Sequence, residues 1–255
     1  MIKKERLLKI LEEVNKKGVI NINDIVAELE VSDMTIRRDL AELEKEGKLL
    51  RIHGGAQSIE SGIPTERSNT EKQSLQTVEK EEIACLAASL VHEGETLFIG
   101  PGTTLEAFAR KLTKRRIRVI TNSLPIFDIL KDSKSIDLIL LGGEYRPITG
   151  AFVGSLTNKS LENLSFSKAF VSANGIHNNN ISTYSENEGL VQQIALEKAM
   201  KKYLLLDNSK FNKFDFYDFY TLDNIDYLLT DTQTTPKQME PFITLTSILS
   251  SENLK

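Results

Sequence analysis

The sequence predicts two unequal domains: three short helices closed by a β-hairpin, and then a larger α/β domain built on a parallel sheet. Apolar residues recur at helical spacing three times within the first 46 residues, and a short strand ending in a glycine pair follows them. Beyond residue 83, short continuous apolar runs alternate with helical segments, which is typical of a parallel sheet covered by helices on both faces. The 255 residues suffice for both domains.

Composition and charge exclude several classes of protein. The chain is 40% hydrophobic and 27% charged, as in globular proteins, and its net charge of −4 gives no overall attraction to nucleic acid or to an anionic membrane. A nucleic-acid site must therefore be local. Cys85 is the only cysteine, which excludes an internal disulfide and a multi-cysteine metal site, and we expect it to lie in the core. We expect a cytoplasmic protein, because no signal peptide and no apolar run of roughly 18 residues is found.

The three helices of the first domain each have an apolar side. The residues that form these sides are Leu7, Leu11 and Val14 in the first helix, Ile22, Ile25, Val26 and Leu29 in the second, and Ile36, Leu40 and Leu43 in the third. Ser32 precedes the third helix, where its hydroxyl can accept a hydrogen bond from an unpaired backbone amide. The spacing predicts a helix-turn-helix that ends at Gly47, a favourable position for a glycine after a helix.

A β-hairpin follows the third helix. Residues 48–56 are typical of a strand that enters a turn at Gly54 and Gly55, so the first domain resembles a winged helix-turn-helix over residues 1–58. Residues 59–82 are polar and contain Gly62 and Pro64, and we interpret them as a linker. The α/β domain is then expected over residues 83–255.

Strands and helices alternate along this second domain. We expect strands at 96–99, 117–120, 136–141, 169–171, 203–206 and 227–229, and helices at 83–92, 105–112, 125–130 and 190–200. Such an order predicts a parallel sheet.

The third helix carries the side chains that reading a DNA major groove requires. Arg37 and Arg38 point about 100° apart, so one can reach a base and the other a phosphate. Hydroxyl groups could bind phosphate, a methionine could meet a thymine methyl, and the wing could lie against the DNA backbone. The candidate DNA contacts are Ser32, Met34, Thr35, Arg37, Arg38, His53, Gly54 and Gly55. The alternative is that the arginines pair with Asp33, Asp39, Glu42 or Glu44 on a solvated helix.

Residues 31–40 and 52–56 resemble the helix-turn-helix signature of the DeoR family of bacterial transcriptional regulators. The resemblance continues through residues 102–104, 121–123, 141–143, 173–176 and 207–210. It implies a repressor that binds operator DNA as a homo-oligomer.

Polar loops follow the predicted strands. Gly102, Thr103 and Thr104 lead from a strand into a helix, where unpaired amides and two hydroxyls suit a phosphate, although a plain strand-to-helix turn with threonine caps is also possible. The other candidates are Asn122 and Ser123 in the next loop, Gly142 and Gly143 where a sugar could approach the backbone, and Lys210 as a positive charge. A dinucleotide site is excluded, because neither the third glycine nor an acidic ribose partner is present.

The family resemblance implies a fold and an effector for the second domain. It resembles the sugar-phosphate isomerase fold and implies that a phosphorylated sugar is sensed, with Asn174 among the candidate contacts. This domain also resembles the branch of the family that represses lactose phosphotransferase systems in Gram-positive bacteria, at residues 100–104, 124–127, 143–146, 151–154 and 203–207. The implied inducers are galactose 6-phosphate or tagatose 6-phosphate.

Other functions remain open from sequence. A sugar-phosphate isomerase with a DNA-binding appendage needs a general base, for which Glu106, Glu144 and Glu186 are candidates. Gly100 and Pro101 replace the acidic residue and serine that the family commonly has, which weakens a catalytic role. The second domain could instead serve only for oligomerisation, or the protein could regulate another hexose operon. We expect a non-enzyme without catalytic residues, metal site or cofactor.

Overall fold

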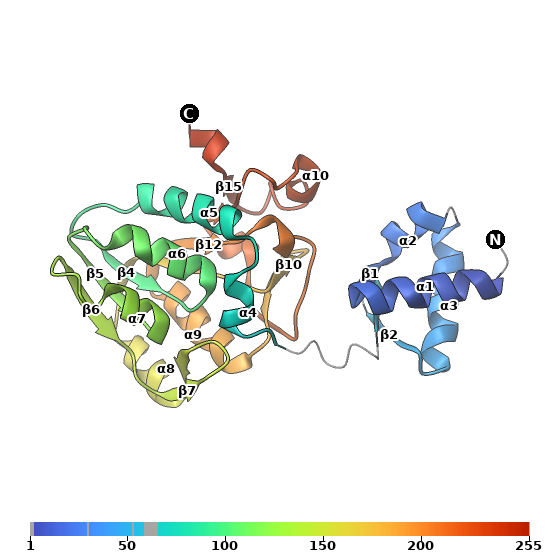
Figure 1. Cartoon of the computed structure of the whole chain (residues 1–255), viewed down its shortest axis with the longest axis horizontal. Coiled ribbons are helices and arrows are strands. Elements are labelled where there is room, and N and C mark those ends of the chain that lie inside the picture. Colours follow the sequence, from blue (N-terminus) through green and yellow to red (C-terminus); the bar gives the residue numbers. More distant parts are fainter. Residues whose placement is uncertain (1–2, 30, 53, 59–65, 255) are drawn as a thin grey trace. The chain divides into compact units, whose positions relative to one another are not determined.

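A computed structural model describes residues 3–29, 31–52, 54–58 and 66–254. The chain divides into two compact units, Met1–Glu66 and Arg67–Lys255, and each is described by itself (Figure 1). In the described part of the chain, no helix is long and apolar enough to cross a membrane.

The first unit is a winged helix-turn-helix, as predicted. Its elements in chain order are α1 (Lys3–Lys17), β1 (Val19–Asn21), α2 (Ile22–Leu29), α3 (Asp33–Lys45), β2 (Leu49–Ile52) and β3 (Gly55–Ser58). Strands β2 and β3 form the predicted hairpin, and β1 pairs antiparallel with β3 to complete a three-stranded sheet in the order β1-β3-β2. The strand β1 was not predicted, because three residues are too few to give a periodic pattern.

The inner face of α3 holds this unit together. Ile36, Leu40 and Leu43 are buried in its core, which confirms the predicted spacing. Ser32 caps α3 by accepting a hydrogen bond from the Thr35 amide. Asp39 lies buried on the same helix and pairs with Arg6 of α1, with 2.5 Å between Nε and Oδ2. The buried face and this pair orient α3, so its opposite face is left to solvent.

The second unit contains a seven-stranded sheet in the order β15-β14-β12-β9-β4-β5-β6, and every pairing in it is parallel. This confirms the predicted α/β fold. Its α-helices and strands in chain order are α4 (Asn69–Gln73), α5 (Thr77–Ser89), β4 (Thr96–Ile99), α6 (Thr103–Leu112), β5 (Ile117–Thr121), α7 (Leu124–Leu130), β6 (Ile136–Leu140), β7 (Glu144–Arg146), β8 (Ala151–Val153), α8 (Ser155–Glu162), β9 (Phe166–Val171), β10 (Gly175–His177), β11 (Asn180–Thr183), α9 (Glu186–Glu197), β12 (Ala199–Leu205), β13 (Tyr217–Thr221), β14 (Tyr227–Leu229), α10 (Pro236–Met239) and β15 (Ser247–Leu249). Short 3-10 helices span Asn208–Lys210, Leu222–Asn224 and Ser251–Leu254.

Alternating side chains of the central strands enter two separate cores. Leu97 and Ile99 of β4 pack on the side of α5, α6 and α7, whereas Phe98 between them packs on the side of α8 and α9. The carboxyl ends of β4, β9 and β12 therefore emerge between α6 on one face and α9 on the other.

Two small antiparallel elements lie outside the parallel sheet. Strands β10, β11 and β13 form one additional sheet, and β7 and β8 form a hairpin. Neither was predicted, because strands of three to five residues are too short to give a clear periodic pattern.

The second unit begins earlier in the chain than the predicted domain. Residues 67–82, interpreted from sequence as linker, include α4 and the start of α5. Asn69 is buried, and its Nδ2 donates to Glu106 Oε1 at 3.0 Å and to the Thr149 carbonyl at 2.9 Å. Polar contacts of this kind fix α4 without an apolar pattern in its sequence. Cys85 was also expected in the core, but it lies on the exposed side of α5.

Candidate functional site

The outer face of α3 carries the predicted DNA-reading residues. Met34 is 59% exposed, a large apolar side chain held in solvent next to Thr35. The Thr35 hydroxyl lies 2.8 Å from the Ser32 hydroxyl, so these two side chains are already ordered at the start of the helix. Such a surface can meet a base edge without first being rearranged.

Arg37 and Arg38 differ in their surroundings. Arg37 is held by Asp33 one helical turn away, with 2.5 Å between Nε and Oδ1 and 3.2 Å between the second pair of atoms. Arg38 is exposed, and no hydrogen bond or ion pair engages its guanidinium within the described residues. The alternative raised from sequence, pairing within the helix, therefore describes Arg37 and not Arg38.

The wing glycines have backbone roles. Gly54 adopts φ +77° in the turn, a conformation that favours glycine, and its carbonyl accepts from the Ile22 amide at 2.9 Å. A Cβ on Gly55 would lie 2.0 Å from the Ile20 carbonyl oxygen, so β1 can approach β3 only at a glycine. His53, the third wing candidate, lies outside the described residues.

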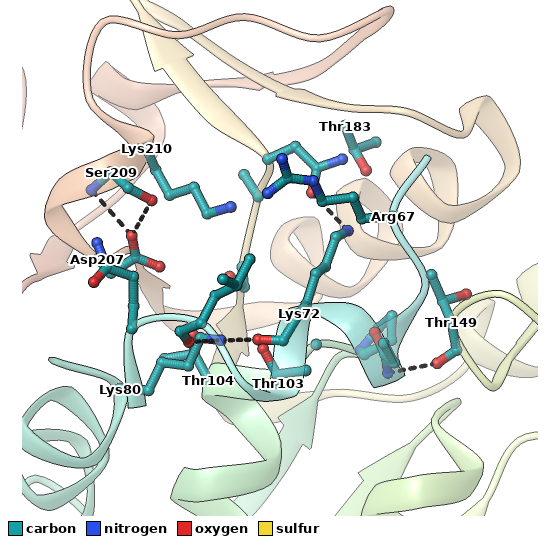
Figure 2. A pocket seen from close by; sticks show the side chains of 18 of the residues that line it. Arg67, Lys72, Lys80, Thr103, Thr104, Thr149, Thr183, Asp207, Ser209 and Lys210 are labelled. Atoms are coloured by element: carbon teal, nitrogen blue, oxygen red, sulfur yellow. Dashed lines mark hydrogen bonds between the residues drawn. The ribbon is translucent and has the colours of Figure 1, made fainter. Parts of the chain in front are cut away.

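A cavity of about 350 Å³ opens in the second unit, where strands of the parallel sheet end (Figure 2). Of the predicted effector residues, Gly102, Thr103, Thr104, Asn174 and Lys210 line it. The structure also places at this cavity residues that were not predicted, namely Arg67, Asn69, Lys72, Leu75, Gln76, Lys80, Pro101, Thr149, Ser172, Ala173, Thr183, Glu188, Gln192, Asp207, Ser209 and Lys213.

Thr103 and Thr104 stand at the first turn of α6, beneath the cavity. Both are more than nine-tenths buried, yet their hydroxyls have no hydrogen-bond partner among the described residues. Gly102 precedes them with φ +136° and brings the backbone to the cavity wall. Two hydroxyls and the amino end of a ten-residue helix thus face one space, an arrangement suited to an anion.

Among the described residues, five basic side chains and two carboxylates line the cavity. Arg67, Lys72, Lys80, Lys210 and Lys213 supply the positive charges, and Glu188 and Asp207 the negative ones. The excess of positive charge concentrates at the cavity although the whole protein is acidic. An anionic ligand is therefore favoured here.

Lys80 is the most buried of these bases. Its Nζ donates to the carbonyls of Lys72 at 2.5 Å and Leu75 at 2.6 Å, which fixes the turn between α4 and α5. Burial lowers the pKa of the Lys80 ammonium below its ordinary value, and the negative charge of Asp207 opposes that shift. A bound anion would stabilise the charged form further.

Asn174 lines the cavity and connects Lys72 to Asp215 through its side-chain amide. Its Oδ1 accepts from Lys72 Nζ at 3.2 Å, and its Nδ2 donates to Asp215 Oδ2 at 2.6 Å. Both ends of the amide are thus bound to protein groups, and the residue positions Lys72.

Asn122, Ser123, Gly142 and Gly143 are not brought to the cavity. Asn122 is fully buried and donates to the Phe152 carbonyl, while Ser123 caps α7 by accepting from the Ile126 amide. Gly142 accepts from Thr157 through its carbonyl, and a Cβ on Gly143 would lie 2.1 Å from the Thr157 hydroxyl oxygen. These residues shape loops beside the sheet.

The basic residues missed by sequence analysis lie largely in the segment assigned to the linker. Arg67, Lys72 and Lys80 are spaced along residues 67–80, without apolar periodicity. The sequence does show a group of basic residues in a polar segment just before the α/β domain. These residues line a common cavity only because α4 folds there.

The acidic residues also differ from the candidates for a general base. None of Glu106, Glu144 and Glu186 lines the cavity, whereas Glu188 does. Glu106 is buried behind α4, where it accepts from Asn69 and Gln73, and burial raises the pKa of its carboxyl.

Family models match both units. Residues 6–62 match the DeoR-like helix-turn-helix domain, and residues 75–232 match the DeoR C-terminal sensor domain.

Similar proteins are named lactose phosphotransferase system repressors. That of Lactococcus lactis subsp. lactis is 52% identical over 255 residues, covering 99% of this chain and 100% of the relative. That of Streptococcus mutans serotype c is 49% identical over 235 residues, covering 91% of this chain and 94% of the relative. That of Staphylococcus aureus strain N315 is 47% identical over 215 residues, covering 84% and 86%.

Solved structures with a similar arrangement share little sequence. Ribose 5-phosphate isomerase A from Methanocaldococcus jannaschii is 19% identical with a TM-score of 0.38, covering 51% of this chain and 52% of that chain. The eIF2B delta subunit from Chaetomium thermophilum is 18% identical with a TM-score of 0.46, covering 62% and 57%.

Proposed function

The chain belongs to the DeoR family of transcriptional regulators, and from this premise we propose that it is a DNA-binding repressor of a lactose phosphotransferase system, controlled by a phosphorylated sugar. The observation that carries the proposal of an effector is the cationic cavity of the second unit, with two threonine hydroxyls that have no hydrogen-bond partner among the described residues. A protein that acts on an operator works where the chromosome is, in the bacterial cytoplasm.

Operator binding is assigned to α3 and the wing. In this proposal Arg38 reads a base or contacts a phosphate, and Met34 meets a thymine methyl. Ser32, Thr35 and Arg37 contact the phosphate backbone. His53, Gly54 and Gly55 bring the wing against the duplex. Two half-sites on an operator call for two copies, so the protein is proposed to act as a homo-oligomer.

Effector binding is assigned to the cavity. Gly102, Thr103 and Thr104 hold the phosphoryl group through backbone amides and hydroxyls, and Lys210 neutralises part of its charge. The effector is proposed to be galactose 6-phosphate or tagatose 6-phosphate, in keeping with the names of the similar repressors. It relieves repression by binding one arrangement of the protein more tightly than the arrangement that holds DNA.

The test is a titration of the full chain onto its upstream DNA by fluorescence anisotropy at fixed salt. Either phosphorylated sugar should weaken DNA binding, whereas galactose and tagatose without phosphate should not. The variant Lys210→Met should keep its DNA affinity and lose the response to the sugar phosphate, and Lys237→Met, at an exposed lysine of α10, serves as the control. Tight DNA binding that no sugar phosphate changes would remove the effector from the proposal.

A regulator without catalysis is also proposed. Glu188 is the glutamate at the cavity, and its Oε1 already accepts from Thr149 and from Arg146. This holds the carboxylate in a fixed position and does not suit it to exchange protons with a sugar carbon. Aldose-to-ketose turnover by the pure protein, lost in Glu188→Gln, would favour the isomerase alternative.

A further inference from the structure

One wall of the cavity differs in chemistry from the cationic wall. It is formed by α9 and the end of β11, and it carries an amide, a hydroxyl and a carboxylate. We propose that Gln192 and Thr183 on this wall form a subsite for the sugar hydroxyl groups of the effector. The inference rests on the proposed function and extends it from the phosphate to the sugar.

One end of the Gln192 amide is held by a hydrogen bond to the protein, and the other end is not. The side chain is 3% exposed, and its Oε1 accepts a hydrogen bond from the Ser172 amide at 3.4 Å. Its Nε2 has no acceptor among the described residues, although the side chain lines the cavity. An amide donor that lines a cavity, and has no acceptor among the described residues, can donate to an oxygen of a bound ligand.

Thr183 ends the strand β11 beside the same space (Figure 2). It is 6% exposed, and its backbone is paired with Tyr217 across the small antiparallel sheet, which holds the side chain in place. No hydrogen-bond partner of its hydroxyl is found in the described part of the chain. A hydroxyl can both donate and accept, as a sugar hydroxyl does.

Glu188 determines which end of the ligand faces this wall. It lies one helical turn before Gln192 on α9, and its side chain is nine-tenths buried at the cavity. The carboxylate, which is paired with Arg146, has no proton to donate to a phosphate but can accept hydrogen bonds from neutral hydroxyls. The phosphate is therefore directed to the cations and to Thr103 and Thr104, and the sugar to Gln192 and Thr183.

The experiment compares two ligands on the full chain by isothermal titration calorimetry. Inorganic phosphate probes the cationic wall alone, and galactose 6-phosphate probes both walls. Gln192→Leu removes the amide at similar volume and should weaken galactose 6-phosphate binding about tenfold, while changing the phosphate affinity by less than about twofold. Thr183→Val should act in the same direction and keeps the shape of a β-branched side chain.

The outcomes separate the two proposals. If the wild type binds neither ligand, the proposed function of the cavity fails, and the sugar subsite with it. If both variants keep the wild-type preference for the sugar phosphate over phosphate, the cavity binds phosphate but Gln192 and Thr183 do not recognise the sugar. Equal weakening of both ligands would also overturn the subsite. Circular dichroism confirms the fold, and Thr183→Val decides if Gln192→Leu fails to fold.

Discussion

The two adjacent arginines of α3 illustrate how a single contact separates residues that sequence alone treats alike. Arg37 lies within an ion pair with Asp33, and both side chains are about half exposed, so the pair itself stabilises the helix little. The pair does, however, occupy the guanidinium. Arg38 has no such partner among the described residues and can meet DNA without breaking a contact.

Replacing Arg38 with alanine should therefore weaken operator binding more than replacing Arg37. A lost bidentate base contact corresponds to about 1–3 kcal/mol, and a lost phosphate contact reduces the salt dependence by about one ion. Anisotropy titrations of Arg38→Ala and Arg37→Ala at several salt concentrations measure both quantities. Equal losses in the two variants would mean that the Asp33 pair does not decide which arginine binds.

A local rule predicts which residues line the cavity. Thr103 and Thr104 begin the helix that follows β4, and Lys210 ends the 3-10 helix that follows β12. Segments that follow strands in this way meet at the carboxyl edge of a parallel sheet. The same rule also selected Asn122 and Gly143, which the structure uses for packing. The rule identifies the edge of the sheet but not which loop bends toward the cavity, since that depends on contacts distant in sequence.

At the scale of elements, long periodic segments were predictable and short ones were not. The central strands β4, β5, β9 and β12 each contain a short, mostly apolar run, so the sequence predicts their positions directly. The helix α4 spans five residues and is held by polar contacts to α6 and to the Thr149 carbonyl, none of which has a sequence pattern.

The short helix α4 lies both at the start of the second unit and at the wall of the cavity. Residue 67 opens the second unit, and Arg67, Asn69 and Lys72 all line the cavity, so the first residues of this unit form part of the proposed effector site. An anion bound to Lys72 would favour the docked form of α4 over an undocked one.

Asn69→Ala should therefore reduce the effect of effector binding on the affinity for DNA. The change removes the donor to Glu106 Oε1 and to the Thr149 carbonyl and leaves both acceptors buried, at a cost of about 1–3 kcal/mol in the docking of α4. We expect unchanged DNA affinity without effector, a smaller response to galactose 6-phosphate, and faster hydrogen exchange in residues 67–80. Asn163→Ala, at an exposed position after α8, is the matched control. A full response in Asn69→Ala would exclude α4 as the coupling element.

For the whole molecule, charge is informative only once it is placed in space. The net charge of −4 predicts no overall attraction to anions, yet five bases of the described part of the second unit gather around one cavity. The sequence contains these bases, but they come from residues 67–80 and 210–213, and only the tertiary fold brings the two segments together. A count along the chain therefore cannot reveal the site.

A repressor that releases DNA when a sugar phosphate binds must also bind the sugar phosphate more weakly when DNA is present. The two effects share one coupling free energy, so the factor by which saturating galactose 6-phosphate raises the dissociation constant for DNA should equal the factor by which saturating operator raises that for galactose 6-phosphate. Couplings of this kind commonly correspond to about 5-fold to 150-fold. Anisotropy gives the first factor, and calorimetry with and without operator gives the second. Unequal factors would mean that a further equilibrium, such as assembly of the homo-oligomer, takes part in the release of DNA.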